Sequence, residues 1–394
     1  MANVSSSNGL EKRPKLRFPG FDEPYRKCRI GDIYAERSQR GAGDMELLSV
    51  TMNDGVMPRS EIEGKDNSSE DKSNYKVVCK GDMVYNSMRM WQGANGVSNY
   101  DGIVSPAYTV LMPTEEIDNQ YFAALFKTSN LINEFRKNSQ GLTSDTWNLK
   151  YPQIRPIRLY IPSLQEQNKI SSFIGTLEER IGKQRQLVDS LKKYKRGAVD
   201  AILSRKLIIH KTSPWSEMKI SDLFSPISEK GHGELTVLTI VQGIGTQPRD
   251  SVDRRISYDK STTNTYKRVC KNDFILHLRS FEGGLEIANS EGIVSPAYTI
   301  LRAKREIVPM FYYAYFRSYW FISNKLRIAV EGIRDGKSIN MDTFWNILVP
   351  CPSIEEQHYI AEYLHHLDAR TSKEEALLAR LQMIRSGFMQ QLFI

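Results

Sequence analysis

Few residues of this 394-residue chain could catalyse a reaction, and no familiar catalytic motif is complete. The chain has no Gly-x-x-x-x-Gly-Lys-Ser/Thr phosphate loop, no Gly-x-Gly-x-x-Gly turn, no Gly-x-Ser-x-Gly elbow and no His-Glu-x-x-His pair. Asp54, Glu63 and Lys65 offer the carboxylates and lysine of a magnesium-dependent nuclease site. Such short patterns often arise by chance, and the second half of the chain has Asp253 and two arginines instead. We therefore predict neither a catalytic site nor a metal site.

Residues that could bind DNA are better represented, and they gather in loops that follow predicted strands. Residues 87–93 place Arg89, Trp91 and Gln92 in one loop. Arginine can bond guanine edges bidentately, and glutamine can do the same with adenine. The corresponding loop of the second half, residues 278–284, contains Arg279 and Ser280 and keeps an arginine, an aromatic residue and glycine. A surface hairpin with a salt-bridged arginine is the alternative, but two related loops with different neighbours favour sequence readout.

Other basic residues could hold DNA phosphates, which contributes affinity without reading bases. The overall balance of 54 Lys+Arg against 46 Asp+Glu, a net charge of +8, points weakly in the same direction. The candidate phosphate contacts are Arg37, Arg40, Arg59, Lys230, Arg249, Arg254 and Arg255.

Two long helical patterns must position these loops. One follows Pro162, where Ser163 and Glu166 have the spacing of a capping box, and the other follows Pro352. Apolar residues then recur at steps of three and four, the spacing of one stripe along a helix. A helix from residue 164 to 205 would be about 60 Å long. We expect the stripes to pair the two helices antiparallel or to dock partners, through Ile170, Leu177, Ile181 and Leu191, and through Ile360, Leu364, Leu367 and Leu381.

The chain is one unit of about 190 residues written twice. Residues 102–109 recur letter for letter at 292–299, and 292 − 102 = 190. We predict an α+β fold with two mixed domains and two long, antiparallel, coiled-coil-like helices between and after them. The expected parts are an arm (1–20), a first domain (21–160), a helix (161–207), a second domain (208–350) and a final helix (351–394). Predicted strands cover 47–50, 83–86, 103–111, 237–241, 274–278 and 293–301, and predicted helices cover 119–137 and 309–327.

Cellular location follows from what the sequence lacks. The four cysteines, Cys28, Cys79, Cys270 and Cys351, show no Cys-x-x-Cys spacing, so free thiols in a reducing compartment are expected. No apolar run approaches the ~20 residues of a membrane span. The first ten residues have no signal-peptide core. We expect a cytoplasmic protein that does not contact membranes.

The ordered set of motifs resembles the DNA-specificity subunit of a Type I restriction–modification enzyme. The resemblance rests on residues 14–21, on residues 80–93, on the repeated Gly-Ile-Val-Ser-Pro-Ala-Tyr, and on the Pro-Ser-Leu-Gln-Glu-Gln and Pro-Ser-Ile-Glu-Glu-Gln helix starts. It implies two target-recognition domains, each reading one half of a bipartite site. It also implies that the helices dock two modification subunits, which methylate adenine at N6 with S-adenosylmethionine after flipping it from the duplex. Restriction subunits would add ATP- and Mg²⁺-dependent translocation and cleavage, and this chain would bind no cofactor itself.

Two other functions remain to be weighed. A stand-alone DNA-binding protein or nuclease fits the basic loops, but the missing catalytic motifs argue against the nuclease and the apolar helical stripe argues for partners. A coiled-coil scaffold without nucleic acid fits the helices, but it gives no reason for two paired basic domains.

Overall fold

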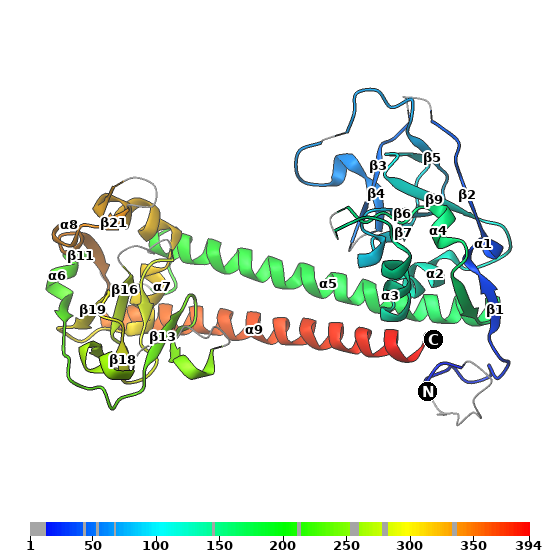
Figure 1. Ribbon diagram of the computed structural model, residues 1–394. Coiled ribbons are helices and arrows are strands. Elements are labelled where there is room, and N and C mark those ends of the chain that lie inside the picture. The colour runs from blue at the N-terminus through cyan, green and yellow to red at the C-terminus, as the bar shows by residue number, and fades with distance from the viewer. Residues whose placement is uncertain are drawn as a thin grey trace. The chain divides into compact units, whose positions relative to one another are not determined.

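The computed structural model describes residues 13–41, 45–52, 55–66, 68–143, 146–210, 214–252, 260–277, 283–332 and 337–394 (Figure 1). The chain forms two compact units. Unit 1 consists of Met1–Arg185 with Leu377–Ile394, and unit 2 consists of Gln186–Ala376. Each unit therefore holds one mixed half and a stretch of both long helices. The predicted α+β fold class, with two mixed halves and two long antiparallel helices, is confirmed.

The mixed half of unit 1 is built on an antiparallel sheet in the order β2-β9-β6-β7. Smaller antiparallel pairs, β1–β10, β3–β4 and β5–β8, surround it. The strands are β1 (Arg26–Arg29), β2 (Tyr34–Glu36), β3 (Leu48–Thr51), β4 (Gly55–Pro58), β5 (Lys76–Val78), β6 (Met83–Asn86), β7 (Asn95–Val97), β8 (Gly102–Val104), β9 (Tyr108–Pro113) and β10 (Arg158–Ile161). The shorter helices are α1 (Ile30–Ile33), α2 (Asn119–Leu125), α3 (Ser129–Asn138) and α4 (Tyr151–Ile154).

The mixed half of unit 2 repeats this topology, with a sheet in the order β12-β19-β16-β17 and the pairs β11–β22, β13–β14 and β15–β18. Its strands are β11 (Ser216–Lys219), β12 (Phe224–Ile227), β13 (Leu238–Val241), β14 (Gly245–Pro248), β15 (Lys267–Val269), β16 (Phe274–His277), β17 (Glu286–Ile287), β18 (Gly292–Val294), β19 (Tyr298–Ala303), β20 (Val330–Glu331), β21 (Ser338–Ile339) and β22 (Leu348–Cys351). Its shorter helices are α6 (Ile220–Leu223), α7 (Pro309–Phe316) and α8 (Met341–Trp345).

Four predicted elements prove to be interrupted. The single strands expected at 103–111 and 293–301 are each two strands, because Ser-Pro-Ala forms a turn between them. The helix expected at 119–137 divides into α2 and α3 near Thr128, whose hydroxyl bonds the Leu125 carbonyl at 2.8 Å. The aromatic stretch expected as a helix at 309–327 continues after α7 as a π turn (Phe321–Lys325) and a 3-10 turn (Leu326–Ala329). Its rings belong to the core, since Phe311, Tyr312, Tyr315, Phe316 and Phe321 are buried.

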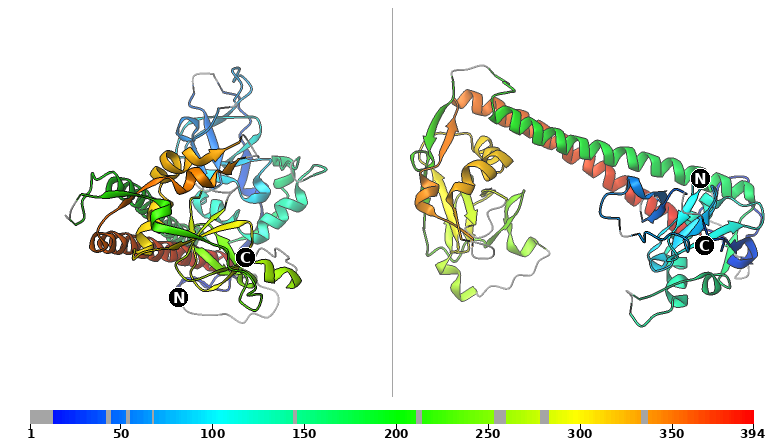
Figure 2. Two further views of the ribbon diagram at one scale, coloured as in Figure 1. Left: turned by 90° about the vertical axis from the view of Figure 1, so that its left-hand side faces the viewer. Right: turned by 90° about the horizontal axis from the view of Figure 1, so that it is seen from above.

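The two long helices, α5 (Leu164–Leu203) and α9 (Ile354–Gln391), run side by side in each unit (Figure 1, Figure 2). In unit 1 the rings of Phe173 and Phe388 meet edge to face at 4.9 Å, and Glu178 pairs with Arg385. In unit 2 the contacts are Lys192–Glu375 at 2.6 Å, Tyr194–Tyr363 at 3.0 Å and Lys195–Asp368. Between Phe173 and Glu178 the partner number falls from 388 to 385, and between Lys192 and Lys195 it falls from 375 to 368, so the pairing is antiparallel in both units.

A glutamine near the start of each long helix joins it to the mixed half. The amide nitrogen of Gln167 donates to the Pro162 carbonyl at 3.0 Å, and its amide oxygen accepts from the Asp118 N–H at 3.1 Å. Gln357 repeats the arrangement with Pro352 at 2.9 Å and Val308 at 2.9 Å. Both glutamines are almost fully buried. Each therefore ties together a strand end, the long helix and the segment that leads into α2 or α7.

The glutamate before that glutamine does not close the predicted capping box. Glu166 is 0% exposed and accepts a bidentate ion pair from Arg17, with both nitrogen–oxygen distances at 2.8 Å. Arg17 also lies over the Tyr25 ring at 5.2 Å, and the hydrogen bond to Glu166 raises the pKa of this guanidinium. In unit 2, Glu356 binds Arg205 at 2.5 Å. The prediction for Glu166 was wrong because a guanidinium 149 residues away satisfies the carboxylate better than a local N–H does.

This ion pair gives a stability prediction. Arg17→Ala leaves Glu166 buried without its cation, and we expect the free energy of unfolding to fall by about 3–5 kcal/mol. Urea unfolding of the full chain, followed by circular dichroism, measures the change. Arg26→Ala is the matched control, because Arg26 pairs with Glu115 at the surface and should contribute no more than about 1 kcal/mol. Equal losses in the two variants would contradict the role assigned to Glu166.

Candidate nucleic-acid interface

The loop at residues 87–93 is a rigid support with two free side chains. A 3-10 turn (Met90–Gln92) forms between β6 and β7 and ends at Gly93, where a φ of 88° suits glycine. Met90 is fully buried in the core of unit 1. Arg89 and Gln92 are exposed, and within the described part of the chain neither side chain makes a hydrogen bond or an ion pair. The loop therefore presents a guanidinium and an amide to solvent from a fixed backbone.

Trp91 supports this loop from within. Its indole N–H donates to the Met88 carbonyl at 3.0 Å, and its ring meets Trp147 edge to face at 5.2 Å. Arg136, exposed in the last turn of α3, covers the Trp91 ring at 5.7 Å. The indole thus helps to hold the loop, and a contact of Trp91 with DNA stays a prediction. Arg136 and Trp147 were not predicted from the sequence, and only the placement of a basic residue and a tryptophan in otherwise polar segments could have drawn attention to them.

The three arginines proposed as phosphate contacts in unit 1 are bonded to their own chain. Arg37 binds Asp82 through two hydrogen bonds of 2.6 and 3.1 Å, and this carboxylate raises the pKa of Arg37. Arg40 donates to the Asn74 carbonyl at 2.6 Å. Arg59 donates to three carbonyls of the loop that follows it, those of residues 62, 64 and 65, at 2.6–3.0 Å. These guanidiniums hold loops of their own chain in place, and their contact with DNA phosphates stays a prediction.

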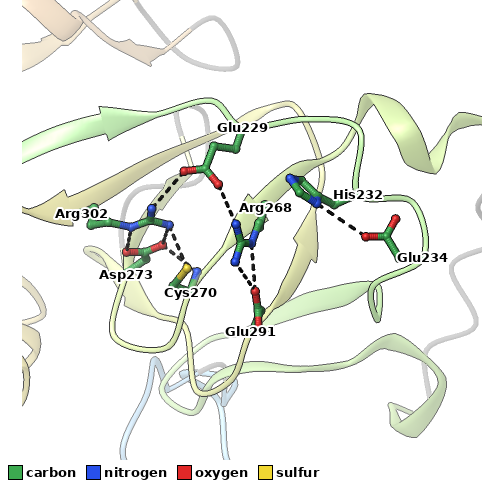
Figure 3. Close-up of polar contacts among 8 residues, drawn as sticks. All are labelled: Glu229, His232, Glu234, Arg268, Cys270, Asp273, Glu291 and Arg302. Atoms are coloured by element: carbon green, nitrogen blue, oxygen red, sulfur yellow. Dashed lines mark hydrogen bonds and ion pairs between the residues drawn. The ribbon is translucent and has the colours of Figure 1, made fainter.

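A similar bonding pattern organises unit 2, although its arginine lies within a strand and not after one (Figure 3). Asp82 accepts from the Cys79 N–H at 2.8 Å, and Asp273 accepts from the Cys270 N–H at 2.7 Å, so both close the same turn. In unit 2 the partner of that aspartate is Arg302 of β19, at 2.8 and 2.9 Å. Glu229 links this pair to Arg268. Both units have this turn, but the arginine that binds its aspartate comes from a different position in each unit.

Of the basic candidates in unit 2, two are described. Lys230 is exposed. Arg249 is half-buried, and its positive charge partly offsets the effect of burial, which raises the pKa of Tyr298. Asp253, Arg254, Arg255, Arg279 and Ser280 lie outside the described residues, as does Asp54 of the nuclease pattern.

The predicted helix residues are mostly buried within their own chain. Ile170 belongs to the core of unit 1, and Ile360 and Leu364 belong to the core of unit 2. Ile181, Leu191 and Leu381 are also buried, while Leu177 and Leu367 are half-buried. These side chains pack the helices against each other and against the mixed halves. A different set is exposed on the same helices: Leu187, Tyr194, Tyr359, Leu377, Met383 and Ile384.

Two negative observations apply to the described residues. They contain no group of three or more His, Cys, Asp or Glu side chains that could hold a metal ion. Among them, no helix has the length and apolar character to cross a membrane.

Comparison with known proteins agrees with this architecture. Residues 27–193 and 251–383 match the family model described as "Type I restriction modification DNA specificity domain". A putative type I restriction enzyme specificity subunit, MjaX, from Methanocaldococcus jannaschii is 20% identical over 77% of this chain and 75% of its own length. The EcoBI specificity subunit from Escherichia coli is 27% identical over 36% of this chain and 31% of its own.

Solved structures share the fold. The S subunit of a Type I system from M. genitalium has a TM-score of 0.58 at 14% identity, covering 97% of this chain and 99% of that one. A chain from a structure of a type I R-M system has a TM-score of 0.59 at 14% identity, covering 96% and 99%. The family model covers well over half of the sequence and accounts for the duplicated halves and helices. The chain therefore belongs to the Type I restriction–modification DNA-specificity family and is a specificity subunit of such a system.

Proposed function

We propose that each unit reads one half of a bipartite DNA site in the cytoplasm, and that α5 and α9 dock two modification subunits. Those subunits would methylate adenine at N6 with S-adenosylmethionine, and restriction subunits would add ATP- and Mg²⁺-dependent cleavage. This chain would contribute recognition and no catalytic group. The observation that carries the proposal is the duplication. The two units have sheets with the same strand order and the same connecting turns, but the loops that follow these strands differ in sequence.

The sequences of the loops that follow β6 in unit 1 and β16 in unit 2 support separate readout of the two half-sites. Residues 87–93 present Arg89 and Gln92, and the corresponding residues 278–284 differ at most positions. Base edges are distinguished by the type and placement of donors and acceptors in the groove. Two copies of one support with different side chains suit two different half-sites.

Exposed apolar side chains on the long helices support partner docking. Tyr194 is 56% exposed on α5, and Met383 is 74% exposed on α9. These positions remain exposed after the helices have paired, and side chains of this kind are common in protein interfaces. A stand-alone nuclease has less support, since Glu63 and Lys65 are exposed loop residues and the Lys65 carbonyl is bonded by Arg59.

The first functional prediction concerns the separation of activities. The purified chain should neither methylate nor cut DNA, whereas co-expression with a Type I modification subunit from the same host should yield a stable complex that methylates adenine. Pull-down on a tagged chain, followed by a methylation assay with labelled S-adenosylmethionine, tests both points. Activity of the chain alone, with contaminating subunits excluded, would contradict a purely recognising role.

The second prediction tests whether the units read independently. Exchanging residues 25–160 for the same part of a related subunit should change one half-site and leave the other intact, because unit 2 keeps all of its loops. Mapping methylated adenine across the host genome gives the recognised sequence directly. A change in both half-sites would show that readout is shared between the units.

The third prediction concerns Arg89. If its guanidinium bonds a guanine edge bidentately, Arg89→Ala should lose about 1–3 kcal/mol of discrimination at one base pair. Competition binding of the complex against duplexes substituted at each position measures the loss. Arg26→Ala serves as the control, because that exposed arginine lies on β1 outside the loop. An unchanged preference at every position would assign Arg89 to another role.

A further inference from the structure

Two lysines of unit 2 lie side by side next to the Ser-Pro-Ala-Tyr turn. The Arg268 N–H of β15 donates to the Glu229 carbonyl at 2.8 Å, so the segment that carries Lys230 runs beside Lys267. The ammonium of Lys267 donates to the Tyr298 carbonyl at 2.7 Å, at the start of β19. Burial and the charge of Lys230 both lower the pKa of Lys267, which agrees with the proximity of the two ammonium groups.

In the corresponding pair of unit 1, the lysine has an anionic partner and the arginine bonds a backbone carbonyl. Lys76 makes the same bond to the Tyr108 carbonyl, at 2.9 Å, and also forms an ion pair with Glu36 at 3.1 Å. Arg40, which forms an antiparallel bridge with Lys76, gives a guanidinium hydrogen bond to the Asn74 carbonyl at 2.6 Å. In unit 1, therefore, both basic side chains have partners within their own chain.

The difference between the units traces to one position of the edge strand. Glu36 of β2 lies opposite Leu111 of β9, and Pro226 of β12 lies opposite Leu301 of β19. Leu111 and Leu301 are equivalent residues, since 301 − 111 = 190, so Pro226 stands where unit 1 has Glu36. The side chain that neutralises Lys76 is therefore missing in unit 2.

Among the residues of unit 2 that the structure describes, no acid takes the place of Glu36. The carboxylate of Glu229, the residue before Lys230, is paired with Arg268 and Arg302 (Figure 3). Within the described residues, neither Lys230 nor Lys267 pairs with a carboxylate. An ammonium has three donors, and the Tyr298 carbonyl uses one of those of Lys267. The pair thus offers two positive charges and several spare donors to an anion.

We propose that Lys230 and Lys267 together bind a phosphodiester of the DNA backbone, at a place where unit 1 makes no such contact. The inference rests on the proposed function, because DNA is the polyanion that a recognition unit meets. Lysine is a point charge that contacts phosphate oxygens without reading bases, so the contact contributes affinity and alignment to unit 2 and leaves the choice of bases to its loops.

The salt dependence of DNA binding tests this directly. Each phosphate neutralised by a lysine contributes about 0.9 to the slope of log K against log salt concentration. We would measure the affinity of the complex with its modification subunits, by fluorescence anisotropy between about 50 and 200 mM salt, for a duplex with the methylated motif and for a shuffled duplex. Lys267→Gln should reduce the slope by about 0.9 and weaken both duplexes to a similar degree.

The duplicated chain supplies its own controls. Lys76→Gln removes the equivalent lysine of unit 1 and should leave the slope unchanged, since Glu36 already neutralises that ammonium. Pro226→Glu restores the missing carboxylate and should reduce the slope while both lysines remain. Lys267→Arg keeps the charge and should keep the slope. Thermal unfolding of each variant identifies any loss that comes from misfolding.

Several results would overturn the inference. Equal slopes for Lys267→Gln and the parent complex, or equal reductions in Lys267→Gln and Lys76→Gln, would show that the lysine pair has no special contact with DNA. If a lysine variant no longer bound the modification subunits but kept the parent's salt dependence of DNA binding, the lysine pair would bind a carboxylate of a modification subunit and not a DNA phosphate. Competition by inorganic phosphate at low concentration would indicate a site for the free ion. If the parent complex showed no salt-dependent DNA binding, the proposed function would itself fail.

Discussion

A buried carboxylate at the start of each long helix is the interaction on which the rest of the fold depends. Glu166 and Glu356 are removed from water, and each needs a guanidinium to offset the cost of burial. Arg17 and Arg205 supply it, and each also lies over an aromatic ring, Tyr25 or Trp215. The neighbouring glutamines add hydrogen bonds to the mixed halves. Helix, strand and sheet are thereby fixed to one another in each unit.

The duplication keeps this framework and changes what it carries. The Cys-Lys-x-Asp turn, the Ser-Pro-Ala-Tyr turn and the lysine bonded to its tyrosine carbonyl occur in both units. Their charged neighbours differ, since Asp82 takes an arginine that follows β2 and Asp273 takes one from β19. Side chains that form hydrogen bonds with backbone groups are the same in the two units, whereas charged side chains that reach solvent differ between them. Such a division allows recognition to change without altering the core.

Sequence reasoning was reliable where a pattern is local and weak where a partner is distant. The long helices were predicted to within a few residues, because periodicity and the proline–serine starts are local signals. The Ser-Pro-Ala turn within a run of strand formers was missed, and so was the break at Thr128. The ion pair between Arg37 and Asp82 was not foreseen, because the two residues are 45 positions apart and only the folded chain brings them near each other. Exposure of Arg89 and Gln92 likewise required the three-dimensional structure.

The ends of the chain meet in unit 1, and this bears on the order of folding during synthesis. The Leu16 N–H caps α9 by donating to the Gln391 carbonyl at 2.9 Å, while α5 is capped by its own following residue, Leu207. Unit 2 is continuous in sequence, so all of its residues are synthesised before Leu377. Unit 1 also requires Leu377–Ile394, which are made after every residue of unit 2. The half that is translated first is therefore the half that is completed last, and a chain that ended at residue 376 would contain every residue of unit 2 but only part of unit 1.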